Sequence, residues 1–307
     1  MMRLADAIDI APCARIPTWF GVGGGAERLA KPRTMDELAA CLRDDPHARI
    51  LGQGANLLVA DETIDDLVVT LGQGAFVSTS IDAQTGLVTA GGGADLAKLI
   101  HATVRAGLTG IEGLVGVPAS LGGAVRMNAG GRSGEIGSAV RTVEVIRQDG
   151  SRERLSREAI GFGYRQSGLG CAIVAGVELQ LTPGDPTAAR DRLKAVMAGK
   201  AASQPLAAKT CGCVFRNPTL SEGIEGIGVA GERVGAGLLI DRAGGKSLAL
   251  PTCRVSRTHA NFIETGPDAS AGDILRLIDR VRALVQARFA VTLETEVVVW
   301  RRGRARL

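Results

Sequence analysis

The sequence predicts an α+β fold with more than one domain, on three observations. The chain has 307 residues, 45% apolar and 22% charged, so it can bury about three quarters of its unfolded surface. Segments with the spacing of amphipathic helices are interspersed with short apolar or alternating segments typical of strands. The chain also has 42 glycines and no internal repeat, which indicates many tight turns and close backbone contacts.

The first third of the chain alternates short helices and strands. Residues 34–44, TMDELAACLRD, have helical spacing, and Thr34 is a suitable cap for a first turn that is rich in acid. The segment 49–61 predicts a strand, a glycine turn and a second strand, and 66–72 predicts another strand. Residues 86–108 predict a strand, a glycine turn and a helix that ends at a glycine.

The rest of the chain continues this mixture of elements. In order, we expect a hairpin over 140–156, a strand over 171–185, a helix over 187–206, a glycine-rich loop over 221–237, a helix over 236–244, a helix over 271–290 and a final strand over 291–302. The turn of the hairpin is Asp149-Gly150, a strong two-residue hairpin signal. Because the helix at 187–206 fades toward Pro205, a domain boundary is expected around 195–210.

Charge and composition exclude several classes of protein. The chain has 36 basic and 32 acidic residues, a net charge of +4, which is too balanced to indicate nucleic-acid binding. The basic end RRGRARL is interpreted as a solvated tail. No apolar segment is long enough for a signal peptide or a membrane span. We therefore expect a cytoplasmic monomer without a membrane or nucleic-acid partner, whose six cysteines are reduced thiols.

Two glycine-rich stretches are typical of backbone that binds a ligand. Gly52 and Gly54 follow a strand in LGQGANLL, where glycine lets backbone amides turn toward a phosphate. This is not the dinucleotide motif GxGxxG, because no long helix follows. The second stretch, residues 110–131, has seven glycines in 22 residues. It predicts neither a regular helix nor a good strand, but backbone wrapped against an elongated ligand.

Seven motifs occur in one order along the chain: ILGQGANLLVADE, GIEGLVGVPASLGGAVRMNAGG, FGYRQSG, QPLAAKTCGCVFRNP, AGLLIDRAGGKSL, VSRTHANFIE and LETEVVV. The series resembles the UDP-N-acetylenolpyruvoylglucosamine reductase family, flavin enzymes of peptidoglycan precursor synthesis. The resemblance extends from about Thr18 to Val299. The short interval between GYRQSG and CAIVAGVEL is similar to the compact class of the family, which lacks a tyrosine-bearing substrate loop.

The resemblance implies a fold and an activity. Two α+β subdomains, residues 1–72 and 73–202, would bind FAD in the manner of the vanillyl-alcohol-oxidase-like fold, and a C-terminal α+β domain, residues 203–307, would bind substrate. NADPH would reduce FAD, which would reduce the enolpyruvyl ether of UDP-N-acetylglucosamine enolpyruvate to UDP-N-acetylmuramate. The sequence departs from the family at Gly21, where many members carry an arginine.

The resemblance also implies the residues that hold FAD. They fall in the two glycine-rich stretches: Gly52, Gly54, Ala55, Asn56 and Leu57 in the first, and Gly113, Gly116, Val117, Pro118, Ala119, Gly122 and Gly123 in the second.

Three residues match catalytic positions of the family. Arg165 would face the substrate carboxylate, for which a guanidinium fork is well suited. Glu296 matches a catalytic glutamate, although strand alternation would place Glu294 on the same side, so spacing alone does not choose between them. Cys213 stands where the family commonly has a serine that protonates the substrate carbon. A thiol, with a pKa of about 8.5, is a stronger acid than an alcohol, and activity should fall where it deprotonates at alkaline pH. Cys211 lacks a matching position.

Four residues match positions near the UDP diphosphate or the substrate: Lys200, Gln204, Arg216 and Asn217. A diphosphate is suited to cations and amide donors of this kind. His259 and Asn261 are expected to be structural.

Three alternatives remain open at this point. Cys211, Cys213, Cys253 and His259 could bind a metal, although C-x-C is poor zinc spacing, and we expect no metal. The glycine stretches would also suit an FAD-dependent oxidase of the same fold that acts on an alcohol or lactone. They would equally suit a non-catalytic flavin-binding protein, which would have no need of Arg165 or Glu296.

Overall fold

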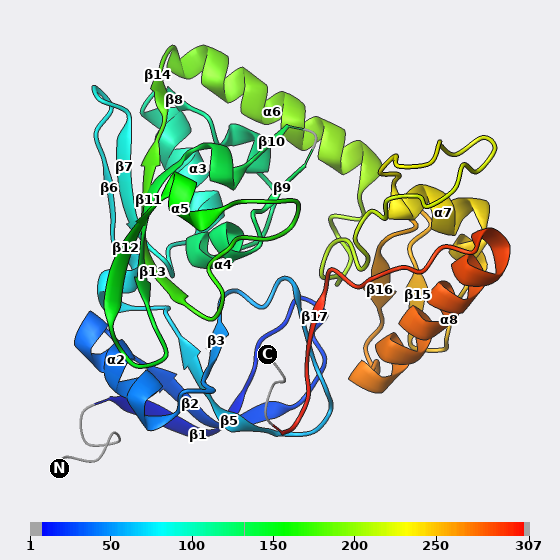
Figure 1. Ribbon diagram of the computed structural model, residues 1–307, viewed down its shortest axis with the longest axis horizontal. Coiled ribbons are helices and arrows are strands. Elements are labelled where there is room, and N and C mark those ends of the chain that lie inside the picture. The colour runs from blue at the N-terminus through cyan, green and yellow to red at the C-terminus, as the bar shows by residue number, and fades with distance from the viewer. Residues whose placement is uncertain (1–7, 132, 304–307) are drawn as a thin grey trace.

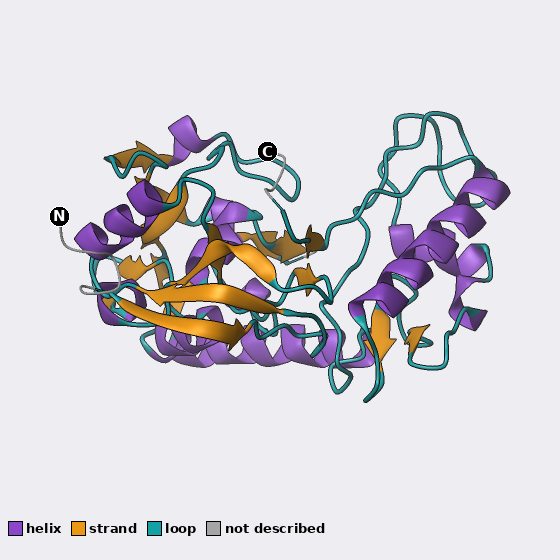
Figure 2. Ribbon diagram, turned by 90° about the horizontal axis from the view of Figure 1, so that it is seen from below, coloured by secondary structure: helices purple, strands orange, loops and turns teal. Residues whose placement is uncertain are grey.

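The computed structural model describes residues 8–131 and 133–303, which form two bodies (Figure 1). The larger body contains the main sheets, and the smaller body contains two helices and a short hairpin. Helix α6 (Pro186–Ser203) runs from the larger body to the smaller one in both views (Figures 1 and 2). The predicted α+β fold is confirmed, and the break expected near 195–210 stays a prediction.

The first sheet of the larger body has four strands in the order β1-β2-β5-β3, with β1 antiparallel to β2 and the other pairs parallel. Its elements are β1 (Asp9–Arg15), β2 (Gly25–Lys31), β3 (Arg49–Leu51), β5 (Ile64–Thr70) and helix α2 (Met35–Asp44). The Thr34 hydroxyl accepts a hydrogen bond from the backbone N–H of Glu37, so the predicted cap is confirmed.

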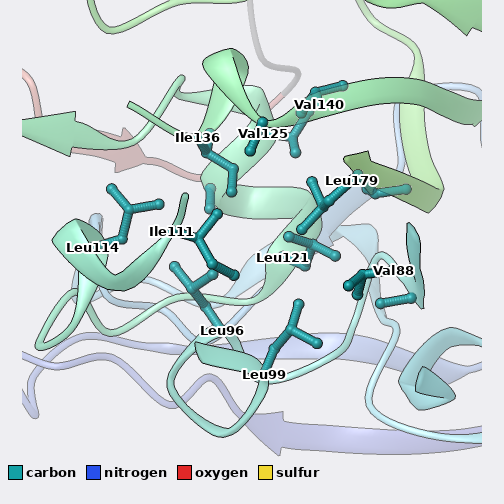
Figure 3. Close-up of a cluster of buried hydrophobic side chains, with 14 of the residues drawn as sticks. Val88, Leu96, Leu99, Ile111, Leu114, Leu121, Val125, Ile136, Val140 and Leu179 are labelled. Atoms are coloured by element: carbon teal, nitrogen blue, oxygen red, sulfur yellow. The ribbon is translucent and has the colours of Figure 1, made fainter. Parts of the chain in front are cut away.

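The second sheet is antiparallel, with five strands in the order β12-β11-β13-β7-β6. Its strands are β6 (Thr79–Ile81), β7 (Leu87–Gly91), β11 (Val140–Ile146), β12 (Arg152–Ser156) and β13 (Ile173–Gln180). Helices α3 (Leu96–Arg105) and α4 (Leu121–Arg126) pack on it. Val88 of β7, Leu96 and Leu99 of α3, Leu121 of α4 and Leu179 of β13 meet in one buried cluster (Figure 3). The predicted hairpin, strands and α3 helix are confirmed.

Short elements connect these layers. They are η1 (Gly74–Val77), β8 (Leu108–Thr109), η2 (Glu112–Leu114), β9 (Gly130–Gly131), β10 (Gly134–Glu135), η3 (Ile136–Ser138), α5 (Arg157–Ile160) and β14 (Thr182–Pro183).

Helix α4 lies inside the second glycine-rich stretch, where no regular helix was expected, so that prediction is wrong for 121–126. Ser120 caps the helix by accepting a hydrogen bond from the N–H of Gly123. The glycines are needed because the helix lies directly against backbone. A Cβ at Gly122 would lie 2.8 Å from the carbonyl oxygen of Gly92. Tertiary packing therefore overrides the low helix propensity of glycine.

The smaller body consists of α7 (Ala236–Arg242), η4 (Gly245–Ser247), β15 (Cys253–Val255), β16 (Ile263–Thr265) and α8 (Ala271–Phe289). Its core includes Phe215, Leu239 and Ile278. The N-terminus of α8 contacts the larger body, since Asp61 accepts hydrogen bonds from the N–H groups of Ala271 and Gly272.

The end of the chain returns to the larger body. Strand β17 (Val298–Trp300) pairs in parallel with β4 (Leu57–Val59). The predicted strand over 291–302 is wrong in length, because residues before 298 make only an isolated bridge, between Thr295 and Phe215. Residues 304–307 of the basic tail lie outside the described residues.

Among the described residues, the helices are each too short or too polar to cross a bilayer.

Candidate active site

Arg165 lies in the loop between α5 and β13, in a left-handed backbone conformation with φ of 54°. Such a conformation is unfavourable for a residue other than glycine. The loop is held by the exchange of backbone hydrogen bonds between Gly163 and Gln166. The buried side chain of Asn128 also donates to the carbonyl oxygen of Gly163, at 2.9 Å. These hydrogen bonds fix the backbone of the loop, and so the direction in which the Arg165 side chain leaves it.

Arg165 forms an ion pair with Glu296, with 2.9 Å between Arg165 Nε and Glu296 Oε1. The two side chains are 17% and 15% exposed. Burial raises the pKa of the Glu296 carboxyl, and the positive charges of Arg165 and Arg216 oppose that rise. Glu294 is exposed to solvent. The structure thus selects Glu296 as the carboxylate that faces Arg165, a choice that spacing could not make.

Cys213 is half-buried and lies in the field of this ion pair. Burial and, to a smaller extent, the charge of Glu296 raise the pKa of its thiol to about 12, although the charge of Arg165 opposes the rise. The thiol is therefore protonated at neutral pH, as a proton donor requires. The expectation that this thiol has its ordinary pKa is wrong, because burial, which the sequence could not show, raises that pKa. Cys211 packs in the core of the smaller body.

Asn261 holds the segment that carries Cys213. Its Oδ1 accepts a hydrogen bond from the N–H of Phe215 at 2.9 Å, and its Nδ2 donates to the Phe215 carbonyl at 2.8 Å. Its backbone carbonyl accepts from Val214 N–H. The expected structural role of Asn261 is therefore confirmed. His259 accepts from the N–H of Asn261 through Nδ1, at 3.2 Å.

Tyr164 joins the loop that carries Arg165 to the smaller body, a role that sequence reasoning missed. Its ring lies 5.4 Å from Arg165 Cζ and 4.2 Å from Arg233 Cζ, distances typical of cation–π contacts. Its hydroxyl accepts a hydrogen bond from the N–H of Asn217 at 3.2 Å. The only sequence signal was its position beside Arg165 in a motif, because Arg233 is 69 residues away.

Arg216 and Asn217, predicted to bind substrate, follow Cys213 by three and four residues. Arg216 Nε is buried without a hydrogen-bond partner in the described part of the chain. The Asn217 side chain accepts from the N–H of Ala236 at 3.0 Å. Together with Arg165 and Arg233, Arg216 makes this a strongly positive region, which is suited to a substrate with several negative charges.

Lys200 and Gln204 lie at the end of α6 rather than among these arginines. Lys200 Nζ donates to the carbonyl oxygen of Val115 at 2.6 Å, and burial lowers the pKa of its amine. Gln204 is the residue that caps the C-terminus of α6. The structure therefore places Lys200 against the second glycine-rich stretch.

A cavity of about 470 Å³ lies between the first sheet and the elements α4 and β13. Three of the predicted cofactor residues line it, namely Gly52, Gly122 and Gly123. The others, Gly54, Ala55, Asn56, Leu57, Gly113, Gly116, Val117, Pro118 and Ala119, do not.

Two of these other glycines are required by chain packing. A Cβ at Gly54, where φ is +65°, would overlap the Pro17 carbonyl, and one at Gly113 would overlap that of Ser133. Asn56 instead connects the first glycine stretch to Glu296, since its Nδ2 donates to the carbonyl oxygen of Glu296 at 3.0 Å.

The chemistry of the cavity suits part of an anionic dinucleotide such as FAD. Its walls are glycine backbone and apolar side chains, and the charged side chains that line it are basic, with no carboxylate among the described residues. Ser120, Arg126 and the Gly92-Gly93 turn also line it and were missed. The turn had been predicted only as a connection between a strand and a helix.

The structure offers no support for a metal site. Within residues 8–131 and 133–303, no group of three or more His, Cys, Asp and Glu side chains is placed to hold a metal ion.

Comparison with protein families gives two matches. Residues 26–156 match the model described as FAD binding domain, and residues 204–300 match that of the UDP-N-acetylenolpyruvoylglucosamine reductase C-terminal domain.

Individual relatives match nearly the full length of the chain. It is 40% identical to a UDP-N-acetylenolpyruvoylglucosamine reductase of Heliobacterium modesticaldum, over 94% of this chain and 88% of that protein. It is 38% identical to one from Moorella thermoacetica, over 95% and 92%. Among solved structures, the reductase of Thermus caldophilus superimposes with a TM-score of 0.78 at 36% identity, covering 98% of this chain and all of that one.

Proposed function

The chain belongs to the UDP-N-acetylenolpyruvoylglucosamine reductase family, and we propose that Arg165, Cys213 and Glu296 carry out its chemistry on the enolpyruvyl group. The reaction is the NADPH-dependent reduction of UDP-N-acetylglucosamine enolpyruvate to UDP-N-acetylmuramate in peptidoglycan synthesis. Gly52, Gly122 and Gly123 would hold part of FAD, which when bound would supply hydride chemistry between NADPH and the methylene carbon of the substrate. The chain must then bind the substrate carboxylate and supply one proton to the adjacent carbon.

Arg165 binds the substrate carboxylate. As hydride adds to the methylene carbon, negative charge develops on the adjacent carbon and spreads to the carboxylate, where a fixed guanidinium stabilises it. A guanidinium also remains charged throughout the working pH range. The observation that carries the assignment is the ion pair with Glu296, 2.9 Å long and largely buried, which fixes Arg165 beside the Cys213 thiol.

Cys213 supplies the proton. Its S–H bond breaks as the new C–H bond forms at the adjacent carbon, and the thiolate then recovers a proton from solvent. Its raised pKa supports this role, because the thiol is almost fully protonated when hydride arrives.

Glu296 orients Arg165 and limits the excess of positive charge while the site is empty. A carboxylate so close to the substrate's own carboxylate is tolerated only where arginine balances it or where its pKa is raised. Both conditions are met here. Arg216 and Asn217 would bind the diphosphate or substrate, and Lys200 and Gln204 remain candidates for the same role.

The proposal is tested by separating the two half-reactions. Under anaerobic conditions, NADPH should bleach the flavin absorbance, and addition of the enolpyruvyl nucleotide should restore it. An oxidase would instead restore the absorbance with oxygen and be reduced by an alcohol or lactone, and a non-catalytic flavoprotein would do neither. Failure of the nucleotide to reoxidise the flavin would contradict the proposal.

We also propose that the protein is a cytoplasmic monomer, and that its FAD-binding subdomains and substrate domain are divided at about residues 72 and 202. Size-exclusion chromatography with light scattering, and limited proteolysis around 195–210, test the oligomeric state and the second boundary.

A further inference from the structure

Basic side chains line the proposed cofactor cavity, and no carboxylate is among its described lining residues. Two arginines line it, Arg49 and Arg126, and the described lining includes no Asp or Glu. A positive charge that lines a concave site and has no carboxylate beside it favours a negatively charged ligand group.

Arg49 is fully engaged by the protein. Its Nε donates to Asp66 Oδ2 at 2.6 Å, and its Nη2 donates to the carbonyl oxygens of Arg301 and Gly303 at 2.9 and 2.7 Å. Its guanidinium also lies over the ring of Trp300. Arg49 therefore ties the C-terminal strand to the first sheet, and its charge is balanced by Asp66.

Arg126 is engaged far less. Within the described residues its side chain makes one hydrogen bond, a long one of 3.4 Å from Nη1 to the carbonyl oxygen of Ala172. Its backbone is held in place, because it is the last residue of α4 and the Ser167 hydroxyl donates to its carbonyl oxygen at 2.9 Å. Most of its N–H donors thus remain for a ligand.

The geometry also indicates which part of FAD meets Arg126. None of Arg165, Cys213 and Glu296 lines the cavity, whereas the reactive ring of the cofactor must lie near these residues. The diphosphate lies in the middle of FAD and is expected at the glycine turn that contains Gly52. The part of FAD beyond that turn, the adenylate half, must then enter the cavity.

Arg126 is within reach of this half. Ser120, the N-cap of helix α4, lies beside the glycine turn, since its Oγ would be 2.6 Å from a Cβ at Gly52. The helix rises only about 9 Å over its six residues. The side chain at its last position leans back toward the N-terminus of the helix. We propose that Arg126 is the cation that binds the adenylate half of FAD and so selects the dinucleotide over FMN.

Measuring flavin affinity tests this directly. The full-length chain is stripped of flavin and then titrated with FAD or with FMN while flavin fluorescence is followed. Loss of a charge-assisted hydrogen bond should weaken FAD binding of Arg126→Ala by about 10- to 100-fold, with little effect on FMN. Arg126→Lys should recover part of the loss. The FAD affinity of Arg126→Ala should also depend less on salt than that of the wild type.

Arg105→Ala is the matched control. Arg105 is likewise an exposed arginine at the last position of a helix, α3, but it does not line the cavity. It should bind both flavins as the wild type does. Wild-type FAD affinity in Arg126→Ala, an equal loss for FAD and FMN, or an unchanged salt dependence would each overturn the proposal. Since the readout is flavin binding, its failure would leave the roles of Arg165, Cys213 and Glu296 untouched.

Discussion

The thiol of Cys213 shows how a side chain's surroundings decide its chemistry. In solution a thiol has a pKa of about 8.5 and would be partly ionised at mildly alkaline pH. In the folded protein, burial and the neighbouring Glu296 raise the pKa of Cys213 to about 12. The advantage of cysteine over serine as an acid is therefore smaller than the residue type suggests, but the proton is retained over a wider range of pH.

Substitutions at the two neighbouring cysteines should separate their roles. Cys213→Ser should keep substantial activity, since a hydroxyl can give the proton from the same position. Cys213→Ala should reduce the rate of flavin reoxidation by substrate about 10²- to 10⁴-fold and leave reduction by NADPH intact. Cys211→Ala should turn over normally. Stopped-flow absorbance measures both half-reactions, and normal reoxidation in Cys213→Ala would falsify the assignment.

The raised pKa predicts an unusual pH dependence. Flavin reoxidation should stay constant between pH 7 and 10, because the reactive form is the protonated thiol and its deprotonation requires a pH near 12. The loss of activity expected at mildly alkaline pH should thus move to higher pH. A pH series of reoxidation rates checks this, and a decline centred between pH 8 and 9 would show that the thiol ionises as it does in water.

Arg165 and Glu296 should affect only the substrate half-reaction. Arg165→Ala and Glu296→Gln should each slow flavin reoxidation about 10²- to 10³-fold, as is typical when a group that stabilises developing charge is removed. NADPH should still bleach the flavin in both variants. Loss of that bleaching instead would mean that the pair acts on the nicotinamide.

At the scale of elements, the segment 213–216 keeps its position through pairing with two others. Arg216 N–H donates to the Glu294 carbonyl, Glu296 N–H donates to the Val214 carbonyl, and Asn261 bonds both backbone groups of Phe215. These contacts bring Cys213 and Glu296 together without a regular sheet.

Removing the Asn261 side chain should therefore damage both stability and catalysis. Asn261→Ala leaves the N–H and carbonyl of Phe215 buried and unpaired, which should cost about 2–5 kcal/mol of unfolding free energy. Reoxidation by substrate should slow, while flavin reduction should change little, because Cys213 shifts but the flavin site does not. Urea denaturation and stopped-flow absorbance measure these effects; a variant of wild-type stability and reoxidation rate would exclude this role for Asn261.

For the molecule as a whole, the decisive contact is the return of the chain through β17. This strand runs from the smaller body back to the larger one (Figure 1). It pairs with β4, and Val298 and Trp300 line the cavity. Trp300 also lies 5.6 Å from Arg49 Cζ. The strand thus connects the smaller body, the first sheet and the cavity in which we propose that FAD binds.

Trp300→Ala should weaken this coupling. We expect a loss of about 2–4 kcal/mol of unfolding free energy, somewhat below the value for a fully buried tryptophan, and a lower flavin content after purification. Trp19→Ala is the control for stability, since Trp19 is 46% exposed and its loss should cost less than about 0.5 kcal/mol. Equal stability of the two variants would contradict the proposed role of β17.

Much of the fold was predictable because it depends on local signals. The cap at Thr34, the Asp149-Gly150 turn and the helical spacing of 271–290 each act within a few residues, and each predicted element is present. The helix α4 was missed because it is stabilised by contacts with distant backbone rather than by its own residues. The final strand was predicted too long because residues 291–297, although of strand-forming types, do not pair with a regular strand.

The sequence by itself determined the ordered motifs, and through them the family and the candidate catalytic residues Arg165, Cys213 and Glu296. Only the tertiary structure decided between Glu294 and Glu296, because that choice depends on which carboxylate meets an arginine 131 residues earlier in the chain. It also decided the acidity of Cys213 and the exposed charge of Arg126 in the cofactor cavity. Burial and the proximity of distant charges arise only when the chain is folded, so no local pattern could have revealed them.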